Sequence, residues 1–140
     1  MARARRSLAG KVVAITGGAR GIGRATAAAL IHQGARVAIG DIESDLAAQT
    51  AQELGSGTLG LALDVTDRAS FTEFLDAVEE GLGPLDVLIN NAGIMPIGPF
   101  VDETDRTAQR MIDINLTGVI YGSKLAVERF LPRGRGHLVN

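Results

Sequence analysis

Cysteine and tryptophan are both absent from the 140-residue sequence. Without cysteine, the chain has no disulfide, no thiolate metal ligand and no cysteine nucleophile. Aromatic residues make up 4% of the chain, which argues against the stacking platforms that bind nucleic-acid bases. The two histidines, His32 and His137, are too few for a histidine-based metal centre. These absences exclude disulfide-framework, thiolate-zinc and cysteine-nucleophile chemistry.

Excess positive charge and long apolar runs are also missing. The 14 Lys and Arg against 16 Asp and Glu give a net charge of −2, whereas phosphate contacts require clustered Lys and Arg. A membrane span needs about 20 apolar residues and a secretory signal about 7–15, and no such run is present. We therefore expect a cytoplasmic protein without nucleic-acid or membrane partners. Residues 1–7, with three arginines, are expected to form a flexible leader; an organelle presequence or a basic arm is the alternative.

Short apolar runs alternate with helix-length segments along the whole chain. Hydrophobic residues make up 46% of the sequence, enough for one domain with a core. The apolar runs predict strands at 11–16, 36–40, 60–63, 85–89 and 137–140. The segments between them predict helices at 21–33, 44–54, 68–82 and 104–130. This order predicts a single α/β domain over residues 1–140, a doubly wound parallel sheet with helices on both faces.

A glycine-rich segment, Thr16-Gly-Gly-Ala-Arg-Gly-Ile-Gly23, joins the first predicted strand to the first predicted helix. Glycine allows positive φ and lets the backbone approach a phosphate. The helix N-terminus adds unpaired N–H groups and a partial positive charge, so a pyrophosphate would fit there. An ordinary glycine-rich turn is the alternative. The candidate cofactor-binding residues of this segment are Gly17, Arg20, Gly21, Ile22 and Gly23.

Three more polar segments follow predicted strands, where a doubly wound sheet binds its ligand. Asp41 comes after the second strand, in the place of an acid that accepts hydrogen bonds from an adenosine ribose; its alternative role is a helix N-cap. Asp64 and Val65 follow the third strand and could face an adenine ring, although Asp64, Thr66 and Asp67 also suit a turn and a cap. The fourth strand is followed by Asn90-Asn-Ala-Gly93, which taken alone is a turn.

Together with Asn115, these segments resemble the short-chain dehydrogenase/reductase family from about Leu8 onward. The resemblance implies an NAD(P)-dependent Rossmann-fold oxidoreductase that acts on alcohols and ketones and is often a homotetramer. It implies that the glycine loop holds the pyrophosphate and that Asp64 and Val65 contact adenine. It also implies that the segment with Asn91, Ala92 and Gly93 steadies the central strand and flanks the cofactor ribose.

The family's catalytic set is an Asn in the long helix, then a Ser, then Tyr-x-x-x-Lys. Asn115 matches the first position, and the resemblance implies that it holds a water in a proton relay; a solvated or core-bonded amide in a helix is the alternative. Tyr121 and Lys124 are separated by three residues rather than four and precede the fifth predicted strand. We interpret both as surface or subunit-interface residues. The catalytic half of the family therefore lies outside residues 1–140, and a chain ending at Asn140 is expected to be inactive.

The resemblance also bears on cofactor choice and assembly. Arg20 stands where NADP-dependent members often carry a base, and Asp41 where NAD-dependent members carry an acid; we expect NAD. Gly118 and Gly122 share a face of the 104–130 helix, which suggests close approach of another helix. We expect a homodimer or homotetramer through this helix.

Two alternative functions are compatible with the same sheet. One is a non-catalytic dinucleotide-binding or sensor protein, and the other is a methyltransferase that holds S-adenosylmethionine. Asp41 suits either adenosine ligand, but Asn90-Asn-Ala-Gly93 together with Asn115 favours the dehydrogenase.

Overall fold

A computed structural model describes residues 7–140. The expected leader at 1–7 therefore lies, apart from Ser7, outside the described residues. Within 7–140 the chain forms one five-stranded sheet in the order β3-β2-β1-β4-β5, and every neighbouring pair is parallel. The strands are β1 (Val12–Thr16), β2 (Arg36–Asp41), β3 (Leu59–Ala62), β4 (Val87–Ile89) and β5 (His137–Val139).

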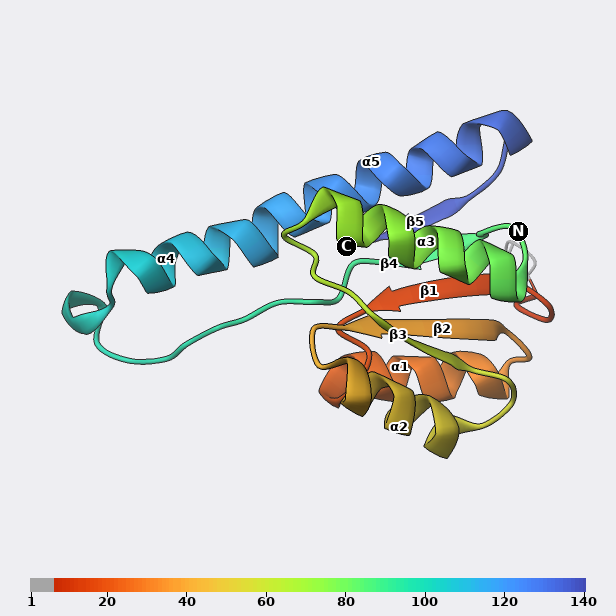
Figure 1. Cartoon of the computed structure of the whole chain (residues 1–140), viewed down its shortest axis with the longest axis horizontal. Coiled ribbons are helices and arrows are strands. Elements are labelled where there is room, and N and C mark those ends of the chain that lie inside the picture. The colour runs from red at the N-terminus through yellow and green to blue at the C-terminus, as the bar shows by residue number, and fades with distance from the viewer. Residues whose placement is uncertain (1–6) are drawn as a thin grey trace, which may run out of the picture.

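Helices cover both faces of this sheet (Figure 1). One face carries α1 (Gly21–His32) and α2 (Ser44–Leu54), and the other carries α3 (Arg68–Leu82) and α5 (Gly118–Phe130). Ahead of α5 come α4 (Asp105–Ile112) and a π-helical turn (Asp113–Thr117), and single 3₁₀ turns occur at Phe100–Asp102 and Leu131–Arg133. The predicted boundaries of the strands and of the first three helices agree with these elements within two residues, whereas the single helix predicted at 104–130 is divided into α4, the π-helical turn and α5. The doubly wound, Rossmann-like α/β fold is confirmed.

The interior of each central strand is apolar because both faces of the strand are buried. All five residues of β1 are buried. Val13 and Ile15 point toward α1 and α2, while Val12 and Ala14 point toward α3 and α5. Alternate residues of a strand point to opposite faces, so one continuous apolar run supplies two cores. The helix face predicted for α3 is confirmed as buried at Phe71, Phe74, Leu75, Val78 and Leu82.

Gly118 and Gly122 are close to parts of their own chain. A Cβ at Gly122 would lie 2.3 Å from Asn90 Oδ1 and 2.6 Å from Phe71 Cζ, and one at Gly118 would lie 2.9 Å from Val65 Cγ2. The neighbouring helix inferred for Gly122 is thus α3 of the same chain. These glycines are explained by internal packing and give no support to a subunit interface.

Tyr121 also differs from the expected surface position. Its side chain is partly buried and packs against the core between the sheet and α3. The Arg68 guanidinium lies 5.9 Å from the centroid of its ring. Lys124 is exposed, as expected. Tyr121 is therefore a packing residue, because it lies on the side of α5 that faces α3.

Asp86 organises the edge of the sheet opposite to the strands' carboxyl ends. Its Oδ2 accepts a hydrogen bond of 3.1 Å from the Val12 N–H, and its Oδ1 lies 3.1 Å from Arg133 Nη2 and 3.8 Å from Lys11 Nζ. Burial raises the pKa of Asp86, but the Val12 N–H and the charges of Lys11 and Arg133 outweigh it and hold the pKa below its usual 3.8. The ionised form is therefore the one that the fold stabilises.

We expect the Asp86 carboxylate to make the free energy of unfolding depend on pH in the acid range. A folded-state pKa below the unfolded value contributes stability above the unfolded pKa, and that contribution is lost as the pH falls through the folded value. The stability advantage of the wild type over Asp86→Asn should therefore shrink as the pH falls from about 5 to below 3.8. Urea denaturation of both proteins across this range measures it. A difference that stays constant with pH would contradict the prediction.

Among the residues that the structure describes, no helix has the length and apolar character needed to cross a membrane.

Candidate functional site

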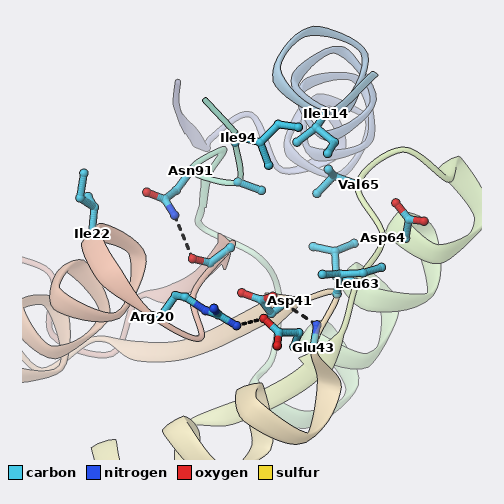
Figure 2. A pocket seen from close by; sticks show the side chains of 14 residues that line it. Arg20, Ile22, Asp41, Glu43, Leu63, Asp64, Val65, Asn91, Ile94 and Ile114 are labelled. Carbon is cyan, nitrogen blue, oxygen red and sulfur yellow. Dashed lines mark hydrogen bonds and ion pairs between the residues drawn. The ribbon is translucent and has the colours of Figure 1, made fainter. Parts of the chain in front are cut away.

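A cleft of about 520 Å³ opens at the carboxyl ends of the strands, and Figure 2 shows its lining. The chain runs outward from β1 to β3 and returns to β4 on the other side of β1. The cleft therefore lies at the point where strand order reverses, the usual ligand site of a doubly wound sheet. The sequence-predicted residues that line it are Gly17, Arg20, Ile22, Asp41, Asp64, Val65, Asn91, Ala92 and Gly93. Those that the sequence did not single out are Ile42, Glu43, Leu63, Ile94 and Ile114.

The first turn of α1 faces the cleft with its backbone N–H groups. Gly17 and Gly21 have φ of +66° and +56°, the left-handed region that favours glycine. Arg20 is the N-cap residue, and within residues 7–140 no side chain caps this helix and its first turn holds no acid. Uncapped N–H groups and the positive end of the helix dipole suit an anion. This geometry fits the pyrophosphate of a dinucleotide.

Gly23 lies outside the cleft lining and is needed for packing. A Cβ there would lie 2.3 Å from the Gly17 carbonyl oxygen and 2.6 Å from Asn91 Nδ2. Any larger residue would push α1 away from the glycine loop. Gly23 was expected among the cofactor-binding residues, whereas its observed contacts are those of close packing between α1 and the glycine loop.

Thr16 fastens the ends of β1 and β4 together. Its Oγ1 accepts hydrogen bonds from the N–H groups of Asn91 (3.0 Å) and Ala92 (2.9 Å). The Asn91 side chain returns two bonds, donating from Nδ2 to the carbonyl oxygens of Thr16 and Gly17, both at 3.0 Å. Asn91 therefore holds the glycine loop in place. Thr16 had no predicted role. A polar residue at the end of an otherwise apolar strand could have indicated a side-chain hydrogen bond at this point.

Asp41 is held at the end of β2 by two backbone donors. Its Oδ2 accepts from the Ala19 N–H and its Oδ1 from the Glu43 N–H, both at 3.2 Å. Each oxygen keeps a lone pair for a further donor, so the carboxylate can accept ribose hydroxyls. The alternative role of Asp41 as a helix N-cap is wrong, because the N-cap residue of α2 is Glu43.

Asp64 forms the turn that the sequence suggested as the alternative to an adenine contact. Its Oδ1 accepts hydrogen bonds from the N–H and the Oγ1 of Thr66, at 2.9 and 2.7 Å. Asp67 caps α3 by accepting from the Ala69 N–H at 2.9 Å. The turn and the cap are thus both present, while Asp64 and Val65 also line the cleft.

Asn115 lies in the π-helical turn that interrupts the predicted 104–130 helix. Its Oδ1 accepts from the Ile94 N–H at 2.9 Å, and its Nδ2 donates to the Ile94 carbonyl at 2.8 Å. The side chain therefore holds the backbone of the segment that follows β4, and its bonds lie at the surface rather than in the core. π-Helical turns are often found at functional sites, and a role for Asn115 in proton transfer stays a prediction.

Arg20 and Glu43 form an ion pair across the mouth of the cleft. Figure 2 shows the Arg20 side chain directed toward Glu43 and close to Asp41. Arg20 was expected to contact the cofactor, and its partner Glu43, two residues after Asp41, had no predicted role. The observed contact of Arg20 is thus with an acid of the same cleft.

The family of the chain follows from comparison with known proteins. The family model described as short chain dehydrogenase matches residues 11–140. The chain belongs to the short-chain dehydrogenase family. The cleft of this short-chain dehydrogenase is lined by the glycine-rich segment and by the residues that follow β2, β3 and β4.

Curated relatives support this assignment. The chain is 40% identical over 129 residues to a sorbitol dehydrogenase of Cereibacter sphaeroides, covering 92% of this chain and 50% of that protein. It is 40% identical over 133 residues to a 3-alpha-(or 20-beta)-hydroxysteroid dehydrogenase of Mycobacterium bovis, covering 95% and 51%. It is 39% identical over 126 residues to a galactitol 2-dehydrogenase of Agrobacterium fabrum, covering 90% and 49%. The chain spans about half the length of these relatives.

Proposed function

We propose that the chain is the cofactor-binding part of an NAD-dependent dehydrogenase that acts on a secondary alcohol or ketone. The observation that carries this proposal is the meeting, in one cleft, of the uncapped start of α1 and the backbone-held carboxylate of Asp41. The first suits a pyrophosphate and the second a ribose diol. The relatives named for sorbitol, hydroxysteroids and galactitol support the substrate class.

The residues of the cleft divide the work of holding a dinucleotide. The bound nicotinamide ring supplies the hydride chemistry. The N–H groups at the start of α1 bind the pyrophosphate, Asp41 binds the adenosine ribose, and Asp64 with Val65 borders the adenine. Asn91 keeps the glycine loop in its binding conformation through the bonds from its Nδ2. Asn115 is a positioning residue that acts through Ile94.

The first test is cofactor preference. We expect the protein to bind NAD at least tenfold more tightly than NADP, because a 2′-phosphate would place negative charge beside the Asp41 carboxylate. Asp41→Ala should narrow this ratio of affinities, because it should weaken the binding of NAD and strengthen the binding of NADP. Isothermal titration calorimetry with each dinucleotide gives the four dissociation constants.

Asp45→Ala is the matched control, because Asp45 is an exposed acid in the first turn of α2, outside the cleft lining. It should leave the ratio unchanged. Equal or tighter binding of NADP by the wild type would contradict the proposed preference and would indicate that Arg20 dominates.

Two alternatives are separable from this proposal. Membership of the family supports a dehydrogenase over a methyltransferase that uses S-adenosylmethionine. A dinucleotide sensor would bind NAD in the same cleft without turnover. Following NADH absorbance with a panel of secondary alcohols, in the full-length protein, separates the sensor from the enzyme.

We also propose that copies of the chain associate through the helical segment 104–130. This proposal rests on exposed apolar side chains spaced along that segment, since the glycines have internal explanations. Ile112, Leu116 and Ile120 are 49%, 56% and 42% exposed at intervals of four residues, and Val127 is 40% exposed. Such intervals place side chains on one helix face, and contiguous exposed apolar surface marks an interaction site.

Leu116→Glu should convert the oligomer largely to monomers, because it would place a charge in a desolvated interface. Sedimentation equilibrium of wild type and variant measures the change. Ala48→Glu, at an exposed position on α2, introduces the same charge away from this face and should have no effect. A wild-type monomer, or a variant that sediments like the wild type, would contradict the proposal.

A further inference from the structure

The charges at the mouth of the cleft are unequally distributed. Among the lining residues, all within the described 7–140, Arg20 is the one base, whereas Asp41, Glu43 and Asp64 are acids. Arg20 and Glu43 are the N-cap residues of α1 and α2. They pair with each other directly beside the carboxyl end of β2.

We propose that Glu43 is a specificity-determining residue: by holding the Arg20 guanidinium, it withholds from a 2′-phosphorylated dinucleotide the one cation of the cleft that would bind its phosphate. The inference rests on the proposed function, because it requires a dinucleotide in this cleft. Asp41 disfavours the 2′-phosphate by its own charge. Glu43 removes the compensation that Arg20 would otherwise provide.

The position of Asp41 places the pair where a 2′-phosphate would lie. Asp41 accepts hydrogen bonds from the N–H of Ala19, the neighbour of Arg20, and from the N–H of Glu43 itself. The carboxylate that would accept the ribose hydroxyls is therefore bonded to the backbone on both sides of the ion pair. A phosphate on the 2′-oxygen would lie beside Arg20 and Glu43 together.

The balance of charge at this point depends on Glu43. Arg20, Asp41 and Glu43 together carry one net negative charge, and without the Glu43 carboxylate the remaining two would be neutral. Guanidinium groups bind phosphate through paired N–H donors, but a guanidinium held by a carboxylate has fewer donors to offer. Glu43 therefore acts against the 2′-phosphate both by repulsion and by occupying Arg20.

The size of the effect is limited by solvent. The side chains of Arg20 and Glu43 are 61% and 56% exposed, and exposed ion pairs change an equilibrium by less than about tenfold. Release of Arg20 and loss of one repulsive charge together should strengthen NADP binding about tenfold. NAD, which has no 2′-phosphate, should change by less than about threefold.

A purely structural role of the Arg20–Glu43 pair predicts a different result. If the ion pair only joins the ends of α1 and α2, its removal would lower the unfolding temperature slightly and leave both dinucleotides equally affected. An equivalent pair joins these helices farther along: Arg24 Nη2 lies 2.8 Å from Glu53 Oε2, with side chains 47% and 42% exposed. Glu53→Gln is thus a matched control for breaking an exposed pair between the same two helices outside the cleft.

The test is a double-mutant cycle on dinucleotide affinity. Calorimetry gives the dissociation constants of NAD and NADP for the wild type, Glu43→Gln, Arg20→Gln, the double variant and Glu53→Gln. We expect Glu43→Gln to bind NADP about tenfold more tightly than the wild type, with a smaller gain when the same substitution is made in Arg20→Gln and no gain in Glu53→Gln. Circular dichroism spectra and unfolding temperatures show that each variant is folded.

The outcomes that overturn the inference are distinct from those that overturn the proposed function. If the wild type binds NAD and Glu43→Gln leaves NADP affinity unchanged, Glu43 has no part in specificity. If Glu43→Gln gives the same gain in the wild type and in the Arg20→Gln background, Glu43 does not act through Arg20. If the folded wild type binds neither dinucleotide, the proposed function fails and the inference fails with it.

Discussion

Replacing Thr16 by valine is expected to lower the free energy of unfolding by about 2–4 kcal/mol. The Thr16 side chain is 1% exposed, and its hydroxyl accepts hydrogen bonds from the N–H groups of Asn91 and Ala92. Valine has a similar shape but leaves both donors without this acceptor, and each buried unpaired donor costs about 1–3 kcal/mol. Urea denaturation measures the loss.

Thr16→Ser keeps the hydroxyl and removes only a methyl group, so it should lose far less stability than Thr16→Val. Thr16→Ser should also bind NAD more tightly than Thr16→Val, because the hydrogen bonds from the Asn91 and Ala92 N–H groups hold the cleft-lining segment after β4 against β1. Equal destabilisation by serine and valine would show that the methyl group, rather than the two hydrogen bonds, accounts for the contribution of Thr16.

Replacing Phe71 by alanine is expected to lower the free energy of unfolding by about 3–5 kcal/mol. Phe71 is 0% exposed and packs edge-on against Phe74, with ring centroids 6.3 Å apart. Its ring also lies against Gly122 of α5. Alanine would therefore leave a cavity between the sheet, α3 and α5, and chemical denaturation followed by circular dichroism measures the cost.

Phe100→Ala is the matched control, because Phe100 is 86% exposed. The same substitution there should change the free energy of unfolding by less than about 0.5 kcal/mol. Similar losses of stability at both positions would contradict the burial of Phe71 in the core between the sheet, α3 and α5.

The fold was predictable because its signals are local in the sequence. The residues from Val12 to Ile15 are apolar at successive positions, a pattern typical of a strand covered on both faces. The periodicity of Phe71, Phe74 and Val78 indicated both a helix and its buried face. The π-helical turn at Asp113–Thr117 had no such signal, since its residues are compatible with an ordinary helix.

The site was predictable at the level of strand ends and not at the level of individual contacts. Parallel strands bring their carboxyl ends to one edge, so Asp41 and Asn91 were placed correctly around one cleft. The contact between Thr16 and Asn91 joins residues 75 positions apart, and that between Asn115 and Ile94 spans 21. Such pairs depend on how the elements dock, which spacing along the chain does not determine. The pairing of Arg20 with Glu43 was missed for the same reason.

The strand order also determines when each edge of β1 can be paired during synthesis. β1 finds β2 after one helical crossover, but its partner on the other side, β4, is the fourth strand along the chain. At about 5–20 residues per second, the ribosome needs about 4–15 s to extend the nascent chain from Thr16 to Ile89. During that interval the β4-facing edge of an apolar central strand is unpaired. The time needed to translate residues 17–89 thus sets how long this edge stays open to aggregation.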